Sequence, residues 1–468
     1  MATAKAVPPP VNLVLNHPEL APVREYVSSA SLVEIIRQEI REWQPRGCSI
    51  PDAAAQIAVA TARRARSMLL PRRALVNATG IIIHTGWGNA PLHPAARERL
   101  LQACGATPTG AAGTPSRTET CAKLLRNLTG AEAATITTQN AASLLLVAGA
   151  LAAGSEIVVA ARDLVEISQK ARIGDILQSA GARVIAVGSA NCVNIEDYRR
   201  AVTPQTAMLM RIHVSNVAST GYLEHVTTLE LVDLARAYQI IYVENLGGGS
   251  LVDLEERGLP WCPTLQRAVT DGADLVLASS DKIIGGPQAG VIVGKQHWVR
   301  KISEHHLART CRCGKLTLAA LEATLAVYLT GRAWSEIPAL RLLGMSADEL
   351  YRRATAIANA CSEVDALDAT VQEDVAECGG AVLPGVSLPT WTVRLKHRRL
   401  REDEFRDALL AHGAIARRGQ GMVILDMRSV PPEEDSLLLQ LVQSTCSLDT
   451  TEAARSFTSA APQIPLNR

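Results

Sequence analysis

Short apolar segments alternate with helix-like segments through the middle of this chain. From residue 77 to about residue 329, runs rich in Val, Ile and Ala are separated by stretches whose apolar residues recur at helical spacing. The runs at 273–278 and 240–243 have the continuous apolar content of buried parallel strands. This alternation is typical of βαβ units, and it predicts an α/β domain with a mostly parallel sheet over residues 76–330.

The pattern differs on both sides of this domain. The proline-bearing start, up to about residue 11, predicts disorder, and apolar and charged residues at helical spacing then predict a helical module that ends at residue 75. Beyond residue 330, helical segments and strands such as 391–395 and 422–426 predict a smaller α+β domain over 331–450. The remaining residues, 451–468, are expected to form a flexible tail.

Charge and cysteine usage narrow the classes of function. The 468 residues include 47 Lys and Arg against 46 Asp and Glu, so the net charge of +1 favours no particular partner, and any nucleic-acid contact must come from local patches. The ten cysteines show no paired CxxC spacing, and the chain start lacks an apolar signal core. These features predict reduced thiols in a cytoplasmic protein with no metal site. The longest apolar run, 144–153, is too short to span a membrane and predicts a buried helix.

Lys282 stands where chemistry is expected in such a sheet. It follows the predicted strand 273–278 and precedes the turn Gly285-Gly286-Pro287. Open α/β sheets bind ligands at the carboxyl ends of their strands, and a desolvated amine there can act as a nucleophile. An isolated Ser-Asp-Lys would more often be a surface turn. Because further segments fit the same cofactor, we interpret Lys282 as the Schiff-base lysine of a pyridoxal phosphate enzyme.

Two of these segments match the two ends of the cofactor. Residues 137–143 follow a predicted strand and open the apolar helix, so free backbone N–H groups at Gln139, Asn140 and Ala141 can hold a phosphate. Alone, this pattern indicates only a helix cap. Asn245 ends another predicted strand before a glycine loop, the place where pyridoxal enzymes of this fold carry the partner of the pyridine nitrogen.

Four more polar residues are candidates for ligand contacts. His213 and Asn216 follow a strand and can reach the cofactor ring or its phenolic oxygen, while a hydrogen-bonded core histidine is an equal alternative for His213. Arg309 and Arg312 would share a helix face if their segment is helical, and would then clamp an anion. The alternative for these two arginines is a solvated basic turn.

Several motifs match a known family along most of the chain. The string at 281–290, Asp-Lys-Ile-Ile-Gly-Gly-Pro-Gln-Ala-Gly, is close to family-specific. The other motifs lie at residues 15–20, 76–80, 84–85, 164–167 and 318–325. On these motifs the chain resembles the bacterial selenocysteine synthases, the L-seryl-tRNA(Sec) selenium transferases, which are fold-type-I pyridoxal phosphate enzymes.

This resemblance implies a reaction and its partners. Lys282 would bind the cofactor, the turn at 139–143 would hold its phosphate, and Arg309 and Arg312 would face the selenium donor. The family reaction is a β-replacement that converts Ser-tRNA(Sec) to selenocysteinyl-tRNA(Sec) with selenophosphate, and the freed lysine shuttles a proton. The N-terminal module would bind the tRNA within a ring-shaped homo-oligomer. From charge alone, its basic residues at 62–73 fit a solvated helix face equally well.

Four positions depart from the family pattern. The family has aspartate at Asn245, arginine at Asn89 and at Cys192, and asparagine at Gln139. An aspartate would hold the pyridine nitrogen protonated, and asparagine cannot supply that charge. The neighbouring Glu244 is expected to face the opposite side of the strand, because successive strand residues alternate.

Three functions therefore remain open from the sequence. The retained Lys282, Arg309 and Arg312 favour a working selenium transferase. The missing arginines favour a related pyridoxal phosphate lyase that acts on a small amino compound by elimination. A non-catalytic paralogue that binds tRNA or a true synthase through the helical module is the third possibility.

Overall fold

The computed structural model describes eight stretches of the chain. They are residues 8–43, 50–69, 75–86, 88–105, 115–168, 170–214, 225–380 and 382–447. The expected tail at 451–468 and residues 1–7 of the expected disordered start lie outside them. The chain divides into two compact units, Met1–Leu75 and Val76–Arg468.

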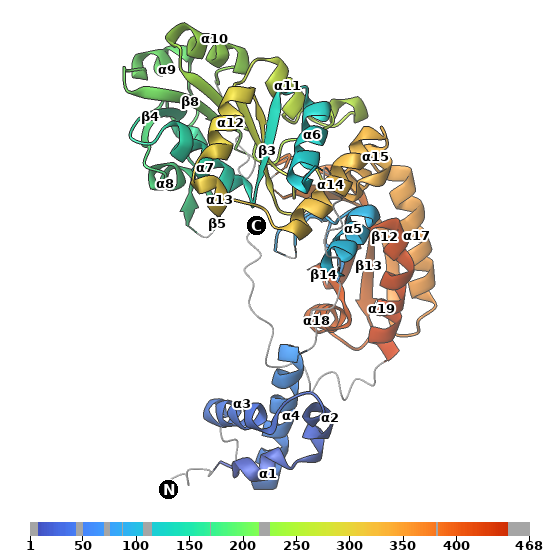
Figure 1. The fold of residues 1–468 in the computed structure, drawn as a ribbon. Helices are drawn as coiled ribbons and strands as arrows, with labels where there is room; N and C mark the ends of the chain where they lie inside the picture. Colours follow the sequence, from blue (N-terminus) through green and yellow to red (C-terminus); the bar gives the residue numbers. More distant parts are fainter. Residues whose placement is uncertain are drawn as a thin grey trace. The chain divides into compact units, whose positions relative to one another are not determined.

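The first unit consists of helices around a small core (Figure 1). Leu32 and Ile36 of one long helix pack with Ile57 of the other. Ser28 caps the first of these helices by accepting a hydrogen bond from the backbone N–H of Ser31 at 3.2 Å. The predicted helical module is confirmed. Its elements are α1 (Val11–Leu15), η1 (Pro18–Leu20), α2 (Ala21–Arg24), α3 (Ser29–Glu42) and α4 (Ile50–Leu69).

The second unit contains a seven-stranded sheet that is mostly parallel, as predicted. Strands β10, β9, β8, β4 and β7 run parallel to one another, and β11 runs antiparallel to both β3 and β10. The spatial order is β3 (Ala133–Thr137), β11 (Gly290–Gly294), β10 (Leu275–Ser279), β9 (Ile241–Asn245), β8 (Thr206–Ile212), β4 (Glu156–Ala160) and β7 (Arg183–Val187).

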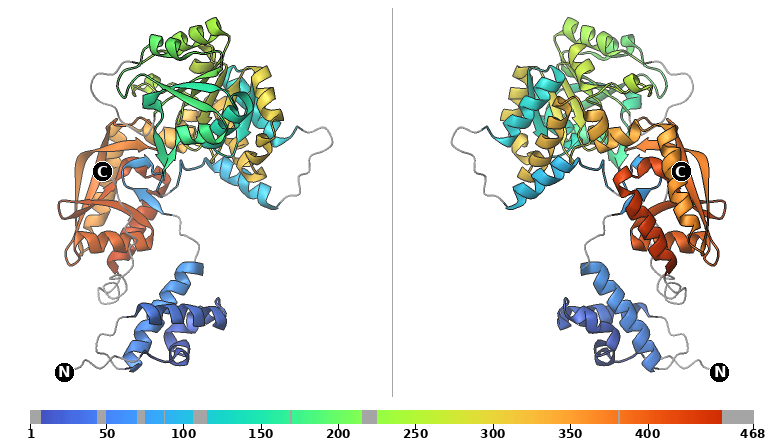
Figure 2. Two further views of the ribbon diagram at one scale, coloured as in Figure 1. Left: turned by 90° about the vertical axis from the view of Figure 1, so that its left-hand side faces the viewer. Right: turned by 90° about the vertical axis from the view of Figure 1, so that its right-hand side faces the viewer.

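Helices cover both faces of this sheet, which explains why its strands are continuously apolar. Met208 and Met210 of β8 pack into one hydrophobic cluster, and Leu209 between them packs into another. Figure 2 shows the helical layers from two sides. The Met208 face is covered by α7 (Asn140–Leu151), α8 (Ile173–Ser179), α12 (Gln296–Glu304) and α13 (Leu307–Thr310). The Leu209 face is covered by α6 (Arg117–Thr129), α9 (Ile195–Ala201), α10 (Thr228–Tyr238), α11 (Leu265–Thr270) and α14 (Lys315–Leu329).

A second, six-stranded sheet forms the core of the smaller α+β part. Its spatial order is β1 (Val76–Ala78), β14 (Ala414–Gly419), β15 (Met422–Asp426), β13 (Leu388–His397), β12 (Leu367–Gly379) and β2 (Ile81–Ile83). The long helices of this part are α17 (Ala347–Ser362), α18 (Glu402–His412) and α19 (Asp435–Ser447). Shorter elements of the unit are α5 (Pro94–Gly105), η2 (Ala161–Asp163), β5 (Glu166–Ser168), β6 (Ala171–Arg172), η3 (Glu255–Arg257), α15 (Ala333–Glu336), α16 (Pro338–Leu343), η4 (Met427–Ser429) and η5 (Pro432–Glu434).

The start of the second unit differs from the prediction. The sequence pattern assigns residues 76–83 to the large sheet, whereas β1 and β2 pair in parallel with β14 and β12 of the smaller sheet. The turn between them explains this placement. The backbone N–H of Gly80 donates to Oγ of Ser429 at 2.8 Å, and a Cβ at Gly80, whose φ is +80°, would collide with the carboxylate of Asp426. Three-residue apolar runs cannot by themselves indicate which sheet they join.

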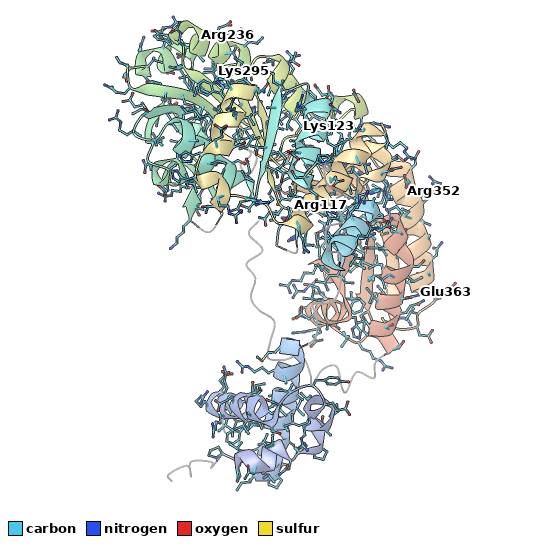
Figure 3. All side chains as sticks on the ribbon, viewed as in Figure 1. Arg117, Lys123, Arg236, Lys295, Arg352 and Glu363 are labelled. Carbon is cyan, nitrogen blue, oxygen red and sulfur yellow. The ribbon has the colours of Figure 1, made fainter. Side chains whose placement is uncertain are left out.

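Charged side chains lie on the outside of the second unit. Arg236 on α10, and Arg352 and Glu363 on and beside α17, are exposed (Figure 3). Within the described stretches, no helix is long and apolar enough to cross a membrane.

Candidate active site

A cavity of about 710 Å³ lies at the carboxyl ends of β8, β9 and β10. Open α/β sheets bind their ligands at this edge. Asn216 lies outside the described residues, so its predicted contact stays a prediction. The walls of the cavity include six of the residues selected from the sequence: Lys282, Gln139, Asn140, Ala141, Asn245 and His213.

Lys282 sits in a turn that hydrogen bonds hold on both sides. The backbone N–H of Ser280 donates to the carbonyl of Ala289 at 2.9 Å, and that of Gly285 donates to the carbonyl of Lys282 at 2.9 Å. Gly285 has a φ of +72°, and a Cβ there would lie 2.5 Å from Cγ2 of Ile337, so this turn requires glycine. The turn therefore fixes the backbone of Lys282 while the side chain lines the cavity.

Helix α7 begins at the cavity wall. Its N-cap residue Gln139 has an extended backbone, and its side chain makes no capping hydrogen bond. The first N–H groups of a helix have no acceptor within the helix, and they carry the positive end of the helix dipole. Because Asn140 and Ala141 bring these groups to the cavity, this end of α7 suits a phosphate.

Asn245 ends β9 with its amide oriented by two donors. Its Oδ1 accepts hydrogen bonds from Nδ2 of Asn140 at 2.9 Å and from the backbone N–H of Gly247 at 3.0 Å. A backbone N–H can only donate, so the atom that it meets must be the oxygen of the Asn245 amide. The NH₂ group of Asn245 thus remains as a donor for a ligand in the cavity.

Glu244, the neighbour of Asn245, serves the other side of β9. Its Oε1 lies 2.7 Å from Nε2 of His213 and accepts a hydrogen bond from Oγ1 of Thr228 at 3.0 Å. Burial acts to raise the pKa of Glu244, but the hydrogen bond and charge of His213, the charge of Arg211 and the Thr228 hydroxyl outweigh it and lower the pKa. Glu244 therefore does not replace the family aspartate, as the strand alternation predicted. His213 is hydrogen-bonded to a buried partner and also lines the cavity, and its contact with the cofactor stays a prediction.

These donors fit pyridoxal phosphate. The helix N-terminus suits the phosphate, Lys282 supplies an amine, and the Asn245 NH₂ group suits an unprotonated pyridine nitrogen, which accepts a hydrogen bond. Oδ1 of Asn140 is buried without a hydrogen-bond partner in the described part of the chain, so a polar group is still expected beside it.

The expected arginine clamp does not form on one helix. Helix α13 ends at Thr310, and Arg312 is extended and makes an isolated antiparallel bridge with Thr137 of β3. The shared helix face predicted for Arg309 and Arg312 is therefore wrong, because pairing with a strand ends the helix between them. Both arginines are exposed, and neither is among the described residues that line the Lys282 cavity.

Two of the four departures from the family pattern, Gln139 and Asn245, line this cavity, whereas Asn89 and Cys192 do not belong to its described lining. Asn89 is exposed in a loop ahead of α5. Cys192 lies in a turn ahead of α9, where its carbonyl accepts a hydrogen bond from the backbone N–H of Ser189 at 2.8 Å.

The hairpin β5–β6 also reaches the Lys282 cavity, which no sequence pattern predicted. Lys170 and Arg172 line this cavity. Lys170 has a φ of +68°, and its backbone N–H donates to Oε1 of Glu166 at 2.9 Å. The motif at 164–167 was visible in the sequence, but a local pattern does not indicate which distant strand ends a hairpin will reach.

The model of the L-seryl-tRNA selenium transferase family (SelA) matches residues 75–431. An L-seryl-tRNA(Sec) selenium transferase of Moorella thermoacetica is 36% identical over 461 residues, covering 93% of this chain and 96% of the relative. One from Yersinia enterocolitica is 34% identical over 448 residues, covering 92% and 96%. A solved D-glucosaminate-6-phosphate ammonia-lyase shares the fold, with a TM-score of 0.56 at 20% identity over 82% of this chain and 97% of that chain.

Fold and site together define a pyridoxal phosphate-dependent transferase with a mostly parallel α/β domain. The chain belongs to the L-seryl-tRNA selenium transferase family.

Proposed function

We propose that this protein converts Ser-tRNA(Sec) to selenocysteinyl-tRNA(Sec) by β-replacement, with selenophosphate as the selenium donor. The observation that carries the proposal is the convergence of Lys282, the N-terminus of α7 and Asn245 on one cavity. The names of the curated relatives support seryl-tRNA(Sec) as the substrate.

The residues of the cavity have separate tasks in this reaction. Bound pyridoxal phosphate withdraws electrons from the α-carbon of an attached amino acid, which lets the α-proton and the β-hydroxyl leave. The amine of Lys282 takes the α-proton and returns a proton to the departing hydroxyl. The backbone N–H groups at Asn140 and Ala141 would hold the phosphate and so would orient the ring. Asn245 would donate to the pyridine nitrogen and would leave it uncharged, which would still permit loss of a β-hydroxyl.

The remaining partners belong to the same proposal. The first helical unit would bind the tRNA, with weak contacts multiplied in a homo-oligomer in the cytoplasm. Within its basic stretch, Nη1 of Arg64 is paired with Glu39 at 2.6 Å and Glu42 at 3.2 Å, so part of that charge already has partners. Contact of Arg309 and Arg312 with the selenium donor stays a prediction.

The direct test is a single-turnover assay. Protein loaded with pyridoxal phosphate is mixed with labelled Ser-tRNA(Sec) and selenophosphate, beside the variant Lys282→Ala. A matched control, Lys123→Ala, changes an exposed lysine on α6. We expect selenocysteinyl-tRNA(Sec) from the native protein and from the control, and a loss of at least roughly a hundredfold with Lys282→Ala, because the general base is missing.

Other outcomes separate the alternatives. Bound cofactor with unchanged serine would refute the transferase and favour elimination on a small amino compound. A protein that binds seryl-tRNA(Sec) but no cofactor would fit the non-catalytic paralogue.

A further inference from the structure

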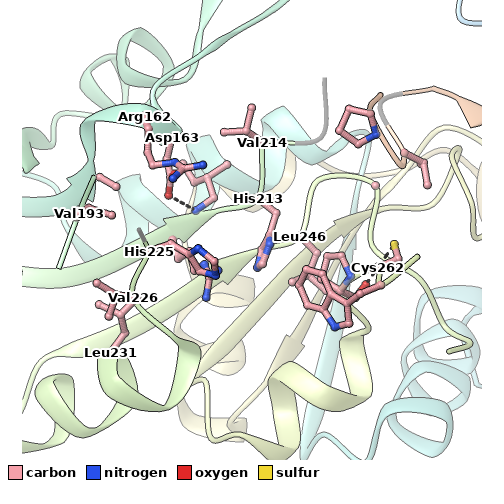
Figure 4. A pocket seen from close by; sticks show the side chains of 18 of the residues that line it. Arg162, Asp163, Val193, His213, Val214, His225, Val226, Leu231, Leu246 and Cys262 are labelled. Atoms are coloured by element: carbon pink, nitrogen blue, oxygen red, sulfur yellow. Dashed lines mark hydrogen bonds between the residues drawn. The ribbon is translucent and has the colours of Figure 1, made fainter. Parts of the chain in front are cut away.

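A second cavity, of about 330 Å³, adjoins the cofactor cavity and has no part in the reaction described above (Figure 4). We call it the Arg162 pocket. It shares Ile212, His213 and Val214 with the cofactor cavity, so the two spaces meet at His213. Its volume lies at the lower end of the range typical of small-molecule sites. A group bound there would therefore lie next to the reacting centre.

One end of the Arg162 pocket is cationic. Arg162 in η2, Arg211 in β8 and His225 ahead of α10 come from three separate segments and all line it. Nη1 of Arg162 is buried and has no hydrogen-bond partner in the described part of the chain. A buried guanidinium N–H without a partner is costly, and an anionic ligand would satisfy it.

The two buried carboxylates near these cations each accept hydrogen bonds from other groups, although Oε2 of Glu244 is buried without a partner in the described part of the chain. Oδ2 of Asp163 accepts a hydrogen bond from the backbone N–H of Ile212 at 3.0 Å, and burial raises the pKa of Asp163. Glu244 is bound to His213 and Thr228, as described above. Burial lowers the pKa of His225, and the positive charges of Arg211, Arg162 and His213 lower it further. The lowered pKa disfavours the charged form of His225, so the positive charge of this pocket comes from Arg162 and Arg211, and His225 offers a ring N–H.

Most of the remaining side chains that line the pocket are apolar, and one of them is an exposed indole. Trp261 lines it, lies 5.9 Å from the ring centre of His213, and is 56% exposed. An exposed indole beside cationic side chains is the arrangement that stacks a nucleic-acid base while the cations hold its phosphate. The apolar walls are completed by Val193, Val226, Leu231, Leu246, Val382 and Leu383.

We propose that the Arg162 pocket binds the terminal adenosine nucleotide of the aminoacylated tRNA. Its phosphate would contact Arg162, Arg211 and His225, and its base would lie against Trp261. The seryl group, which is attached to the ribose of that nucleotide, would then pass His213 into the cofactor cavity. This inference rests on the proposed function, because that function makes the ligand a tRNA end.

The test uses adenosine 5′-monophosphate and inorganic phosphate as probes. The protein is the full chain loaded with pyridoxal phosphate, so that the cofactor's own phosphate site is filled. Binding is measured by calorimetry for the native protein, Arg162→Gln and Trp261→Ala. The control Arg352→Gln changes an exposed arginine on α17. We expect both pocket variants to weaken binding of the nucleotide by roughly tenfold or more, and the control to leave it unchanged.

Binding of inorganic phosphate tests the cationic end of the pocket separately from the Trp261 side chain. Phosphate binding should weaken with Arg162→Gln and stay unchanged with Trp261→Ala. If Trp261→Ala leaves nucleotide binding unchanged, or if the nucleotide binds no better than phosphate, the pocket is an oxyanion site and the nucleotide proposal is overturned. Absence of nucleotide binding at millimolar concentration would also overturn it.

Turnover of Ser-tRNA(Sec) distinguishes failure of this inference from failure of the proposed function. If native protein turns over the tRNA and the two pocket variants leave KM unchanged, the function stands and the pocket inference fails. If nucleotide binding follows the expected pattern but no tRNA is converted, the proposed function fails and the assignment to a tRNA end fails with it, leaving a nucleotide site of another kind. A raised KM in Arg162→Gln and Trp261→Ala, with kcat little changed, supports the proposed function and the pocket inference together.

Discussion

The two faces at the end of strand β9 carry opposite kinds of chemistry. On the face of Asn245, an amide group and the backbone N–H groups at the start of α7 offer hydrogen bonds to the Lys282 cavity, and none of them carries a full charge. On the face of Glu244, a carboxylate is linked to His213, with Arg211 nearby. A negative charge is therefore present on the strand that ends at the Lys282 cavity, but it is hydrogen-bonded to a histidine. Adjacent residues can serve such different environments because strand side chains alternate between faces.

The largest effect on stability is expected from Glu244→Ala. This change leaves His213 and Thr228 without their buried acceptor, so the free energy of unfolding should fall by about 3 kcal/mol. Urea unfolding of the cofactor-free protein measures it, with Glu255→Ala, an exposed glutamate in η3, as the control. A loss no larger than that of the control would mean that the Glu244 face is not structurally important.

A smaller part of the stabilisation by Glu244 depends on pH, and its loss should be measurable in acid. The folded-state pKa of Glu244 is lowered, so the unfolded state binds more protons as the pH falls. The stabilisation is thus present above the pKa of the unfolded state and is lost as the pH falls through the folded pKa. Unfolding free energies of native protein and Glu244→Gln, measured from pH 6 to pH 3, should converge in acid. A difference that stays constant over this range would contradict the charged state of Glu244.

The smallest effect on stability is expected from Asn245→Asp, because the same two donors, from Asn140 and Gly247, can bind the new carboxylate. The free energy of unfolding of the cofactor-free protein should change by less than about 1 kcal/mol. In the variant loaded with pyridoxal phosphate, the protonation of the pyridine nitrogen should change, since a carboxylate would hold that nitrogen protonated. The ¹⁵N chemical shift of labelled pyridoxal phosphate measures this, with Asn12→Asp in α1 as the control. An identical shift in native protein and variant would show that Asn245 does not face the pyridine nitrogen.

Much of the lining of the Lys282 cavity was predictable because it is built from local patterns. The strand before Lys282, the glycine turn after it and the start of α7 are each contiguous in sequence, and the sheet brings strand ends together by rule. The opposite orientations of Glu244 and Asn245 followed from strand alternation alone. The prediction failed where a distant partner decides the conformation, as where Arg312 pairs with Thr137 instead of continuing a helix.

Sequence patterns alone were enough to predict the α/β class, the position of Lys282 before its glycine turn, the start of helix α7 and the place of Asn245 at a strand end. Those features depend on residues next to one another in the chain and on the fixed periodicities of helix and strand. Packing between distant segments places residues 76–83 in the smaller sheet and bonds Glu244 to His213. It also brings Arg162, Arg211 and Trp261 to one pocket. These contacts join segments far apart in sequence, and no local pattern encodes which distant segments will meet when the core packs.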